Sequence, residues 1–213
     1  MSAAPPPGDC RRGDSSNWRL DSGPPPSRCD LFVKETKNRE EPICDDGSMT
    51  TPCGDCGFVY DLAQAGAVPE DIRRQVAGVA AILNSHDVNL RSRRQPSVWS
   101  PLEYGCHLRD MLLVQRERVL AARRVVRPDC SPMGRDERVE HDGYAQQEPE
   151  DVARQLADAA QLFGNVLVQL GEDDWDRTVV YHYPETHERS LRWVAIHTLH
   201  EARHHFLDIR RQV

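Results

Sequence analysis

Apolar residues recur at alternating spacings of four and three between residues 149 and 171, and this regularity constrains the fold more than any other feature. The apolar positions are Val152, Leu156, Ala159, Phe163, Val166 and Leu170. At 3.6 residues per turn they form one stripe along a helix, as in the seam of a helical bundle. We therefore expect a long amphipathic helix with Val152, Leu156, Phe163 and Leu170 buried.

Three further segments carry helical signals. The segment over residues 69–85 starts with a proline and two acids, which the helix dipole favours. The segment over residues 100–124 opens with Ser100, Pro101 and Glu103, the residues of a capping box. The last segment covers residues 190–210. Alternating β-branched runs are almost absent apart from residues 178–181, so we expect no sheet and predict an all-α, antiparallel four-helix bundle.

The first fifty residues differ in composition from the rest of the chain. Prolines stand in threes at residues 5–7 and 24–26, among Gly, Ser, Arg and Asp. Such a composition buries too little apolar surface to offset the entropy of ordering. We expect a disordered tail over residues 1–50 and one domain over residues 51–213. The alternative is that the tail is sequence upstream of a start at Met49.

Charge and hydropathy exclude several classes of partner. The formal net charge of −7 argues against a nucleic-acid-binding surface, which requires a basic patch. No apolar run approaches the twenty residues of a membrane span, and the amino terminus lacks the apolar region of a signal peptide. We therefore expect a cytoplasmic protein that binds neither nucleic acid nor a membrane.

Histidines gather on the last predicted helix. His197, His200 and His204 share one face of it with apolar residues, so burial of these imidazoles requires partners. A divalent ion satisfies them, because imidazole is a preferred ligand of zinc, nickel, copper and iron. His200 and His204 stand four residues apart, the spacing that lets two side chains share one ion. The alternative is a polar cluster that stays partly hydrated or bonds to nearby carboxylates.

A third ligand is expected from the second predicted helix, where His107 lies at the edge of the apolar arc. Metal sites in bundles are built from side chains on facing helices. His107 with His200 and His204 would give three nitrogen ligands and an open position, as in catalytic metal sites. The alternatives are a hydrogen-bonded core histidine at position 107, or His197 as the third ligand. His205 lies about 100° around the helix from His204, so we do not expect it to share the ion.

Cys53 and Cys56 form a CxxC turn that resembles one half of a zinc knuckle. A structural zinc needs four ligands, and no second CxxC follows. Closure of such a site would require distant residues such as Cys106, Cys130 or His86. A redox pair and two reduced thiols in a turn are the alternatives.

Two segments, WSPLEYGCHLRD over residues 99–110 and LHEARHHFLDI over residues 199–209, resemble the DinB-like superfamily in their order and spacing. This superfamily includes YfiT-type metal-dependent hydrolases, mycothiol-dependent maleylpyruvate isomerase and bacillithiol transferases. The resemblance covers residues 53–213 and implies a divalent metal bound, by position, through His107, His200 and His204. The stretches CGDCGFVYD and DGYAQQEPEDVARQL further resemble an actinobacterial branch, which implies a mycothiol-using organism.

The resemblance implies a metal-dependent enzyme with zinc or nickel as the expected ion and mycothiol as a candidate cofactor. In a thiol S-transferase or isomerase, the ion would bind a low-molecular-weight thiol and lower its pKa. In a hydrolase, water would take the same open position. Glu201 and Asp208 are the nearest acids that could orient the ligand imidazoles. The alternative is a non-catalytic metal-binding or stress-response protein, and in either case the bundle faces could form a homodimer.

Overall fold

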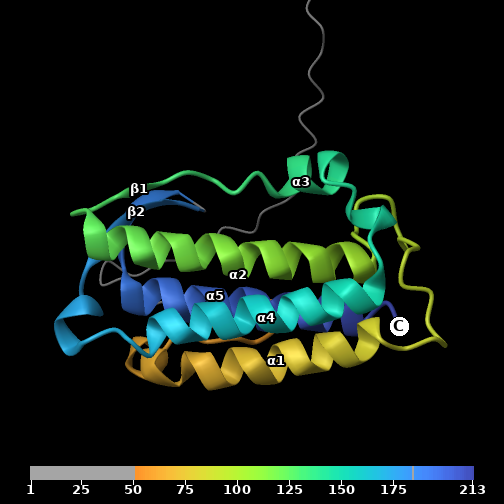
Figure 1. The fold of residues 1–213 in the computed structure, drawn as a ribbon, viewed down its shortest axis with the longest axis horizontal. Coiled ribbons are helices and arrows are strands. Elements are labelled where there is room, and N and C mark those ends of the chain that lie inside the picture. The colour runs from red at the N-terminus through yellow and green to blue at the C-terminus, as the bar shows by residue number, and fades with distance from the viewer. Residues whose placement is uncertain (1–50, 184) are drawn as a thin grey trace, which may run out of the picture. The chain divides into compact units, whose positions relative to one another are not determined.

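Four long helices form the body of the protein in a computed structural model that describes residues 51–183 and 185–213 (Figure 1). The tail predicted over residues 1–50 lies outside the described residues. The long helices are α1 (Val68–Leu83), α2 (Pro101–Arg124), α4 (Pro149–Leu167) and α5 (Leu191–Arg210). Shorter helices are η1 (Leu62–Ala67), α3 (Arg135–His141), η2 (Tyr144–Gln146) and η3 (Glu172–Asp174). No helix in this part of the chain is long and apolar enough to cross a membrane.

The helix starts follow the predicted sequence signals. The Ser100 hydroxyl accepts a hydrogen bond from the backbone N–H of Glu103, and the Glu103 carboxylate accepts one from the backbone N–H of Ser100. This capping box satisfies two backbone donors that the first turn of α2 leaves free. Helices α1 and α4 both have a proline in their first turn, followed by two acids. The predicted capping box of α2 is therefore confirmed.

The apolar stripe of α4 faces the core as its spacing predicts. Val152, Leu156 and Phe163 are fully buried. Leu170 is only partly buried, because α4 ends at Leu167 and the stripe does not continue beyond it. The prediction of burial was therefore wrong for this last position alone.

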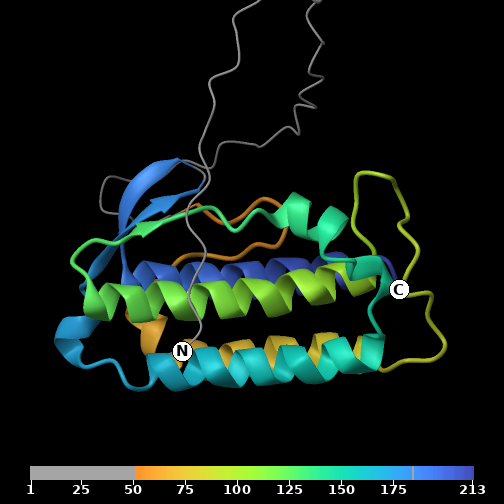
Figure 2. The same ribbon diagram turned by 45° about the horizontal axis from the view of Figure 1, so that its top comes forward.

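The direction of the helices departs from a simple antiparallel bundle. Helices α4 and α5 each pack against both α1 and α2. The colours of Figure 1 show that α2 and α4 run in one direction and that α1 and α5 run in the other. The neighbours α2 and α4 are therefore parallel. The connection over residues 125–148 makes this possible, since it carries the chain back along α2 before α4 begins (Figure 2). Among the largest helix contacts, the antiparallel prediction holds for α1 with α4 and for α2 with α5, whereas α2 with α4 and α1 with α5 are parallel.

A small sheet is present where none was predicted. Its strands are β1 (Asp129–Cys130), β2 (Thr178–His182) and β3 (Thr186–Ser190), in the order β1-β2-β3. Strand β2 pairs parallel to β1 and antiparallel to β3, with Val179 opposite Arg189. Val179 and Tyr181 are buried and alternate with more exposed neighbours, as in a strand that has one face against the core. Strand β2 contains residues 178–181, the β-branched run noted in the sequence. Strand β3 has the polar sequence THERS and gives no apolar alternation to recognise.

The segment before η1 extends along α5 and covers part of its surface. Phe58 and Tyr60 of this segment are buried, and the Phe58 ring stacks on the His200 imidazole with centroids 5.2 Å apart. The Tyr60 hydroxyl lies 2.7 Å from Nδ1 of His197 and 2.9 Å from Nδ1 of His200. The Arg211 guanidinium, just after α5, donates to the backbone carbonyl of Asp55 at 2.9 Å. The histidine-bearing face of α5 is therefore lined by residues from the start of the domain.

The α4 stripe predicts a clear contrast between two neighbouring positions. Replacement Phe163→Ala should lower the free energy of unfolding by about 3–5 kcal/mol, because it removes a fully buried ring from the core. Leu162→Ala is the matched control, since Leu162 is 43% exposed and should change stability by no more than about 0.5 kcal/mol. Urea unfolding followed by circular dichroism measures both. Equal losses in the two variants would contradict this orientation of α4.

Candidate metal centres

Helix α5 carries two pairs of potential ligands, each with a spacing of four residues. His200 and His204 form one pair, and Glu201 and His205 form the other. The pairs are offset by one residue, which rotates them by about 100° around the helix. They therefore face different neighbours.

His107 of α2 faces the second pair. Its imidazole is buried, and its ring centroid lies 5.0 Å from that of His205 and 5.0 Å from that of the Trp99 indole. Neither Nδ1 nor Nε2 of His107 has a hydrogen-bond partner among the described residues. Burial, with a smaller contribution from the charge of His205, lowers the pKa of His107 to about 3. The imidazole is thus neutral and has a free nitrogen lone pair, as a metal ligand requires.

Glu201 and His205 complete this cluster. One potential ligand atom from each of His107, Glu201 and His205 lies within 4.8 Å of the other two. Nδ1 of His205 is 3.0 Å from the Asp208 carboxylate, and Nε2 is 3.5 Å from the Glu201 carboxylate. Burial alone would lower the pKa of His205, but the hydrogen bonds with Asp208 and Glu201 outweigh it and raise that pKa to about 9. Burial would likewise raise the pKa of Glu201, whereas the His205 partner holds it well below its ordinary value.

This cluster has the composition of an open metal site. Two imidazoles and one carboxylate from two facing helices bind iron, zinc or manganese and leave positions for other ligands. Asp208 holds Nδ1 of His205 and so directs Nε2 toward Glu201, which is how carboxylates commonly orient a ligand histidine. The unpartnered nitrogens of His107 are the strongest sign of a ligand, because buried polar atoms without partners are otherwise rare.

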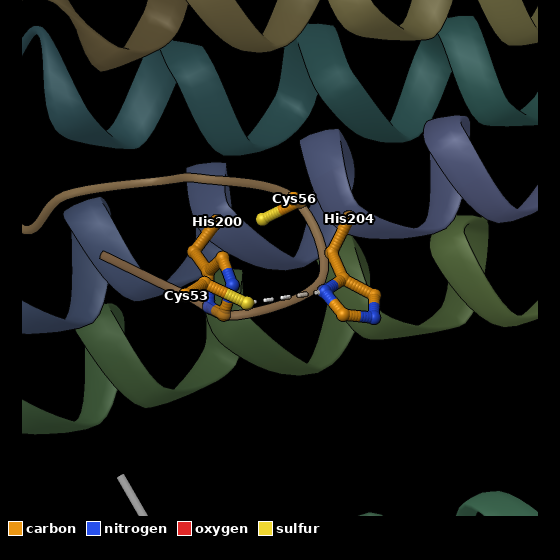
Figure 3. A group of neighbouring side chains, drawn as sticks. All are labelled: Cys53, Cys56, His200 and His204. Carbon is orange, nitrogen blue, oxygen red and sulfur yellow. Dashed lines mark hydrogen bonds between the residues drawn. The ribbon is translucent and has the colours of Figure 1, made fainter. Parts of the chain in front are cut away.

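The first pair on α5 belongs to a different cluster, which Figure 3 shows. His200 and His204 lie with Cys53 and Cys56 of the N-terminal segment, and their potential ligand atoms are all within 4.8 Å of one another. The Cys53 thiol sulfur is 3.7 Å from Nδ1 of His204. Burial, with a smaller contribution from the nearby Cys53 thiol, raises the pKa of the Cys56 thiol to about 11.

A backbone turn presents the two cysteines. The N–H of Cys53 donates to the Phe58 carbonyl, and the N–H of Gly57 donates to the Cys53 carbonyl, both at 2.8 Å. Gly57 adopts φ +67°, a left-handed conformation that glycine takes without strain. The turn therefore places both thiols on the side of the segment that faces α5 (Figure 3).

Two other groupings consist of α5 residues alone. One contains His197, His200 and Glu201, and the other His204, His205 and Asp208. Nδ1 of His197 bonds to the Tyr60 hydroxyl, and the His197 ring stacks on Trp193 with centroids 4.5 Å apart. This side chain is therefore packed and hydrogen-bonded as part of the core. In the second grouping, the Asp208 carboxylate is hydrogen-bonded to Nδ1 of His205.

The predicted ligand set divides between the two clusters. The structure places His107 with Glu201 and His205, and it places His200 and His204 with the cysteines. No ligand group in the described residues unites all three predicted histidines. Glu201 was expected only to orient an imidazole, and His205 was set aside because it faces away from His204. His205 does point to a different side of α5 from His204, and this direction places it against His107 of α2.

The distant residues considered for closing the CxxC site lie elsewhere. Cys106 is buried in α2, where its sulfur is 3.6 Å from the side-chain oxygen of Gln147. Cys130 is in β1, and His86 lines a cleft beyond the end of α1. The sequence signal for the observed neighbours of the two cysteines is the HxxxH of α5, since CxxC with HxxxH is a common zinc-ligand spacing.

A cleft of about 390 Å³ lies along α2, and its lining on this helix begins at Asp110, about one helical turn after His107. Its α2 wall includes Asp110, Val114 and Arg118, which follow His107 at helical spacing on the same side of the helix. The opposite wall includes Ser131 after β1 and Arg138 of α3. The cleft combines cationic, acidic and apolar groups and is large enough for a small polar molecule.

Comparisons with known proteins agree with this architecture. The profile of the DinB superfamily matches residues 70–209, which is more than half of the chain. No curated protein sequence is similar enough to the chain to count as a match. Among solved structures, the chain is similar to YfiT from Bacillus subtilis, described as a probable metal-dependent hydrolase with an unusual four-helix bundle topology. The match has a TM-score of 0.60 and 15% sequence identity, and it covers 81% of this chain and 89% of YfiT.

The protonation of His205 predicts a proton release when a metal binds. At pH 7 His205 carries a proton, because its pKa is about 9, whereas His107 is already neutral with a pKa of about 3. The titratable groups in contact with His205 are Glu201, His204 and Asp208 of α5 and Tyr104 and His107 of α2. Binding of Mn²⁺ should therefore release about one proton at pH 7, and none once the pH exceeds the pKa of His205.

Mn²⁺ is chosen because it prefers oxygen and nitrogen to thiolate ligands and so avoids the cysteine cluster. Titration calorimetry in buffers of different ionisation enthalpy counts the released protons. The affinity for Mn²⁺ should increase with pH up to the pKa of His205, since deprotonation then no longer opposes binding. A release that is equal at pH 7 and above pH 9 would contradict the assignment of His205 as a ligand.

Proposed function

Because the chain belongs to the DinB superfamily, we propose that it is a metal-dependent enzyme whose ion is bound by His107, Glu201 and His205. The observation that carries this proposal is the buried His107 imidazole, whose two nitrogens have no partner and which faces a carboxylate and an imidazole of α5. Three protein ligands leave coordination positions open, which is the arrangement of catalytic sites.

The residues of the chain prepare this site in three ways. His107 supplies a neutral imidazole from α2, because burial keeps its pKa far below its ordinary value. Glu201 supplies a carboxylate that is already ionised, since its pKa is also lowered. Asp208 holds the His205 ring in place through Nδ1. A divalent ion bound there lowers the pKa of a water or thiol and so supplies a nucleophile at neutral pH.

The cleft along α2 is the proposed position of the electrophilic substrate. Arg118 and Arg138 are the cations of its lining, and Asp110, Glu117 and Asp129 are its acids. The Arg118 guanidinium is fixed by the Tyr181 hydroxyl at 2.8 Å and the Ser131 carbonyl at 2.6 Å, so its charge is held in one place. A fixed cation in this cleft can pair with a carboxylate or similar anionic group of a small substrate.

The nucleophile we favour is a low-molecular-weight thiol of the mycothiol type, which makes the reaction a thiol S-transfer or isomerisation. The support is the resemblance of the chain to the mycothiol-using branch of the superfamily. Hydrolysis, with water as the nucleophile, is the second candidate, and the description of YfiT as a probable metal-dependent hydrolase favours it. Both reactions use the same open position on the same ion.

Activity assays separate these functions. Protein loaded with zinc or nickel is incubated with a panel of small electrophiles, with and without mycothiol. Thiol-dependent product formation supports the transferase, and equal turnover without thiol supports the hydrolase. Failure of the loaded protein to turn over any electrophile in either condition would favour the alternative, a non-catalytic metal-binding protein.

Variants of the loaded enzyme link the activity to the proposed ligands. Glu201→Ala should abolish turnover, because it removes the one carboxylate among the three proposed ligands. Asp208→Asn should lower metal affinity by about 10–100-fold, since it weakens the support of a ligand histidine. Asp173→Asn is the matched control, because Asp173 is exposed in η3 and distant in sequence from both clusters. Normal activity in Glu201→Ala would overturn the ligand assignment.

A further inference from the structure

The cluster of Cys53, Cys56, His200 and His204 has no role in the proposed reaction (Figure 3). Two thiols and two imidazoles from distant parts of the chain lie together beneath the N-terminal segment. We propose that these four side chains form a second, structural site that binds zinc and fixes the N-terminal segment to α5. This inference does not depend on the proposed enzymatic function.

The spacing of the ligand atoms suits a zinc ion. Zinc bound by two sulfurs and two nitrogens in a tetrahedron has ligand–ligand distances of about 3.3–3.8 Å, as its bond lengths require. The Cys53 sulfur is already 3.7 Å from Nδ1 of His204. All four ligand atoms are within 4.8 Å of one another, so small side-chain movements are enough to complete the tetrahedron.

The two histidines are oriented as zinc ligands usually are. Nδ1 of His200 lies 2.9 Å from the Tyr60 hydroxyl, while its Nε2 is buried without a partner. Nδ1 of His204 faces the Cys53 sulfur, while its Nε2 is 3.6 Å from the Asp208 carboxylate. In each ring, one nitrogen has an oxygen neighbour and the other is available to an ion. Such oxygen neighbours fix the orientation of ligand imidazoles.

The chemistry of the four ligands indicates a structural role. A set of two cysteines and two histidines fills all four positions of zinc and leaves none for a substrate. The cysteines are separated by two residues and the histidines by three, both within the ranges seen in zinc fingers. Both cysteines bind as thiolates, so two thiol protons pass to solvent when the ion binds.

The site would join segments that are 144 residues apart in sequence, as counted from Cys56 to His200. The N-terminal segment otherwise rests on α5 through Phe58, Tyr60 and the contact of Arg211 with Asp55. A bound ion adds coordinate bonds that the unfolded chain cannot make, so binding stabilises the folded state. Loss of the ion should loosen this segment before it affects α1, α2 and α4.

Cobalt(II) substitution tests the site directly. The purified full-length protein is stripped of metal and titrated with Co²⁺, which gives a near-ultraviolet charge-transfer band only when thiolates bind it. We expect this band in the wild-type protein, its loss in the double variant Cys53→Ser/Cys56→Ser, and its retention in Cys130→Ser. Glu201→Gln should also retain the band, because the His107 cluster contributes no sulfur.

A further variant keeps the test decisive if the double variant does not fold. His204→Cys preserves four ligands and adds a thiolate, so its band should be stronger than that of the wild type. Zinc should also raise the melting temperature of the wild-type protein and of Glu201→Gln. A wild-type protein without the band, or an undiminished band in a folded cysteine double variant, would overturn the proposal and leave the enzymatic function untouched.

Discussion

Helix α5 buries several polar side chains, and their need for partners determines how the neighbouring segments pack against it. His197 and His200 are buried almost completely, and Glu201, His204 and His205 are mostly covered. Burial of an imidazole or carboxylate is unfavourable unless the group has a partner. The Tyr60 hydroxyl supplies partners for His197 and His200, and the acids of α5 supply them for His205. His107 and Nε2 of His200 have none, which is why we assign both to metal ions.

The helical repeat divides these groups between two neighbours. Successive residues of α5 differ in direction by about 100°, so the Glu201 pair turns toward α2 while the His200 pair turns toward the N-terminal segment. Asp208 lies between the clusters, 3.0 Å from Nδ1 of His205 and 3.6 Å from Nε2 of His204. One carboxylate therefore supports a ligand of the proposed catalytic ion and a ligand of the proposed structural ion.

The long helices could be predicted from sequence because their amphipathic patterns and caps are local. The capping box at Ser100 and the stripe through Phe163 depend only on neighbouring residues. The sheet could not be predicted, because β3 is polar and β1 has two residues paired with a strand about fifty residues away. The parallel arrangement of α2 and α4 depends on the path of residues 125–148, which leaves no signature in either helix.

The candidate ligands could be predicted as a group but not in their pairing. Every residue from Trp193 to His200 is buried, because α5 is covered by α1, α2 and the N-terminal segment. A helix buried on nearly all sides has no single apolar face, so its sequence does not show which histidine pair faces α2. His107 could be identified as a ligand candidate from its position at the edge of an apolar arc. Its neighbours on α5 could not, because a shift of one residue along that helix exchanges the pair His200 and His204 for the pair Glu201 and His205.

Anomalous X-ray diffraction from crystals of the metal-loaded protein tests whether α5 carries two metal sites, because it locates each ion among its ligands. We expect two anomalous peaks on neighbouring faces of α5. One should lie among His107, Glu201 and His205, and the other among Cys53, Cys56, His200 and His204. A single peak bound by His107, His200 and His204 together would contradict the division of α5 into two metal sites.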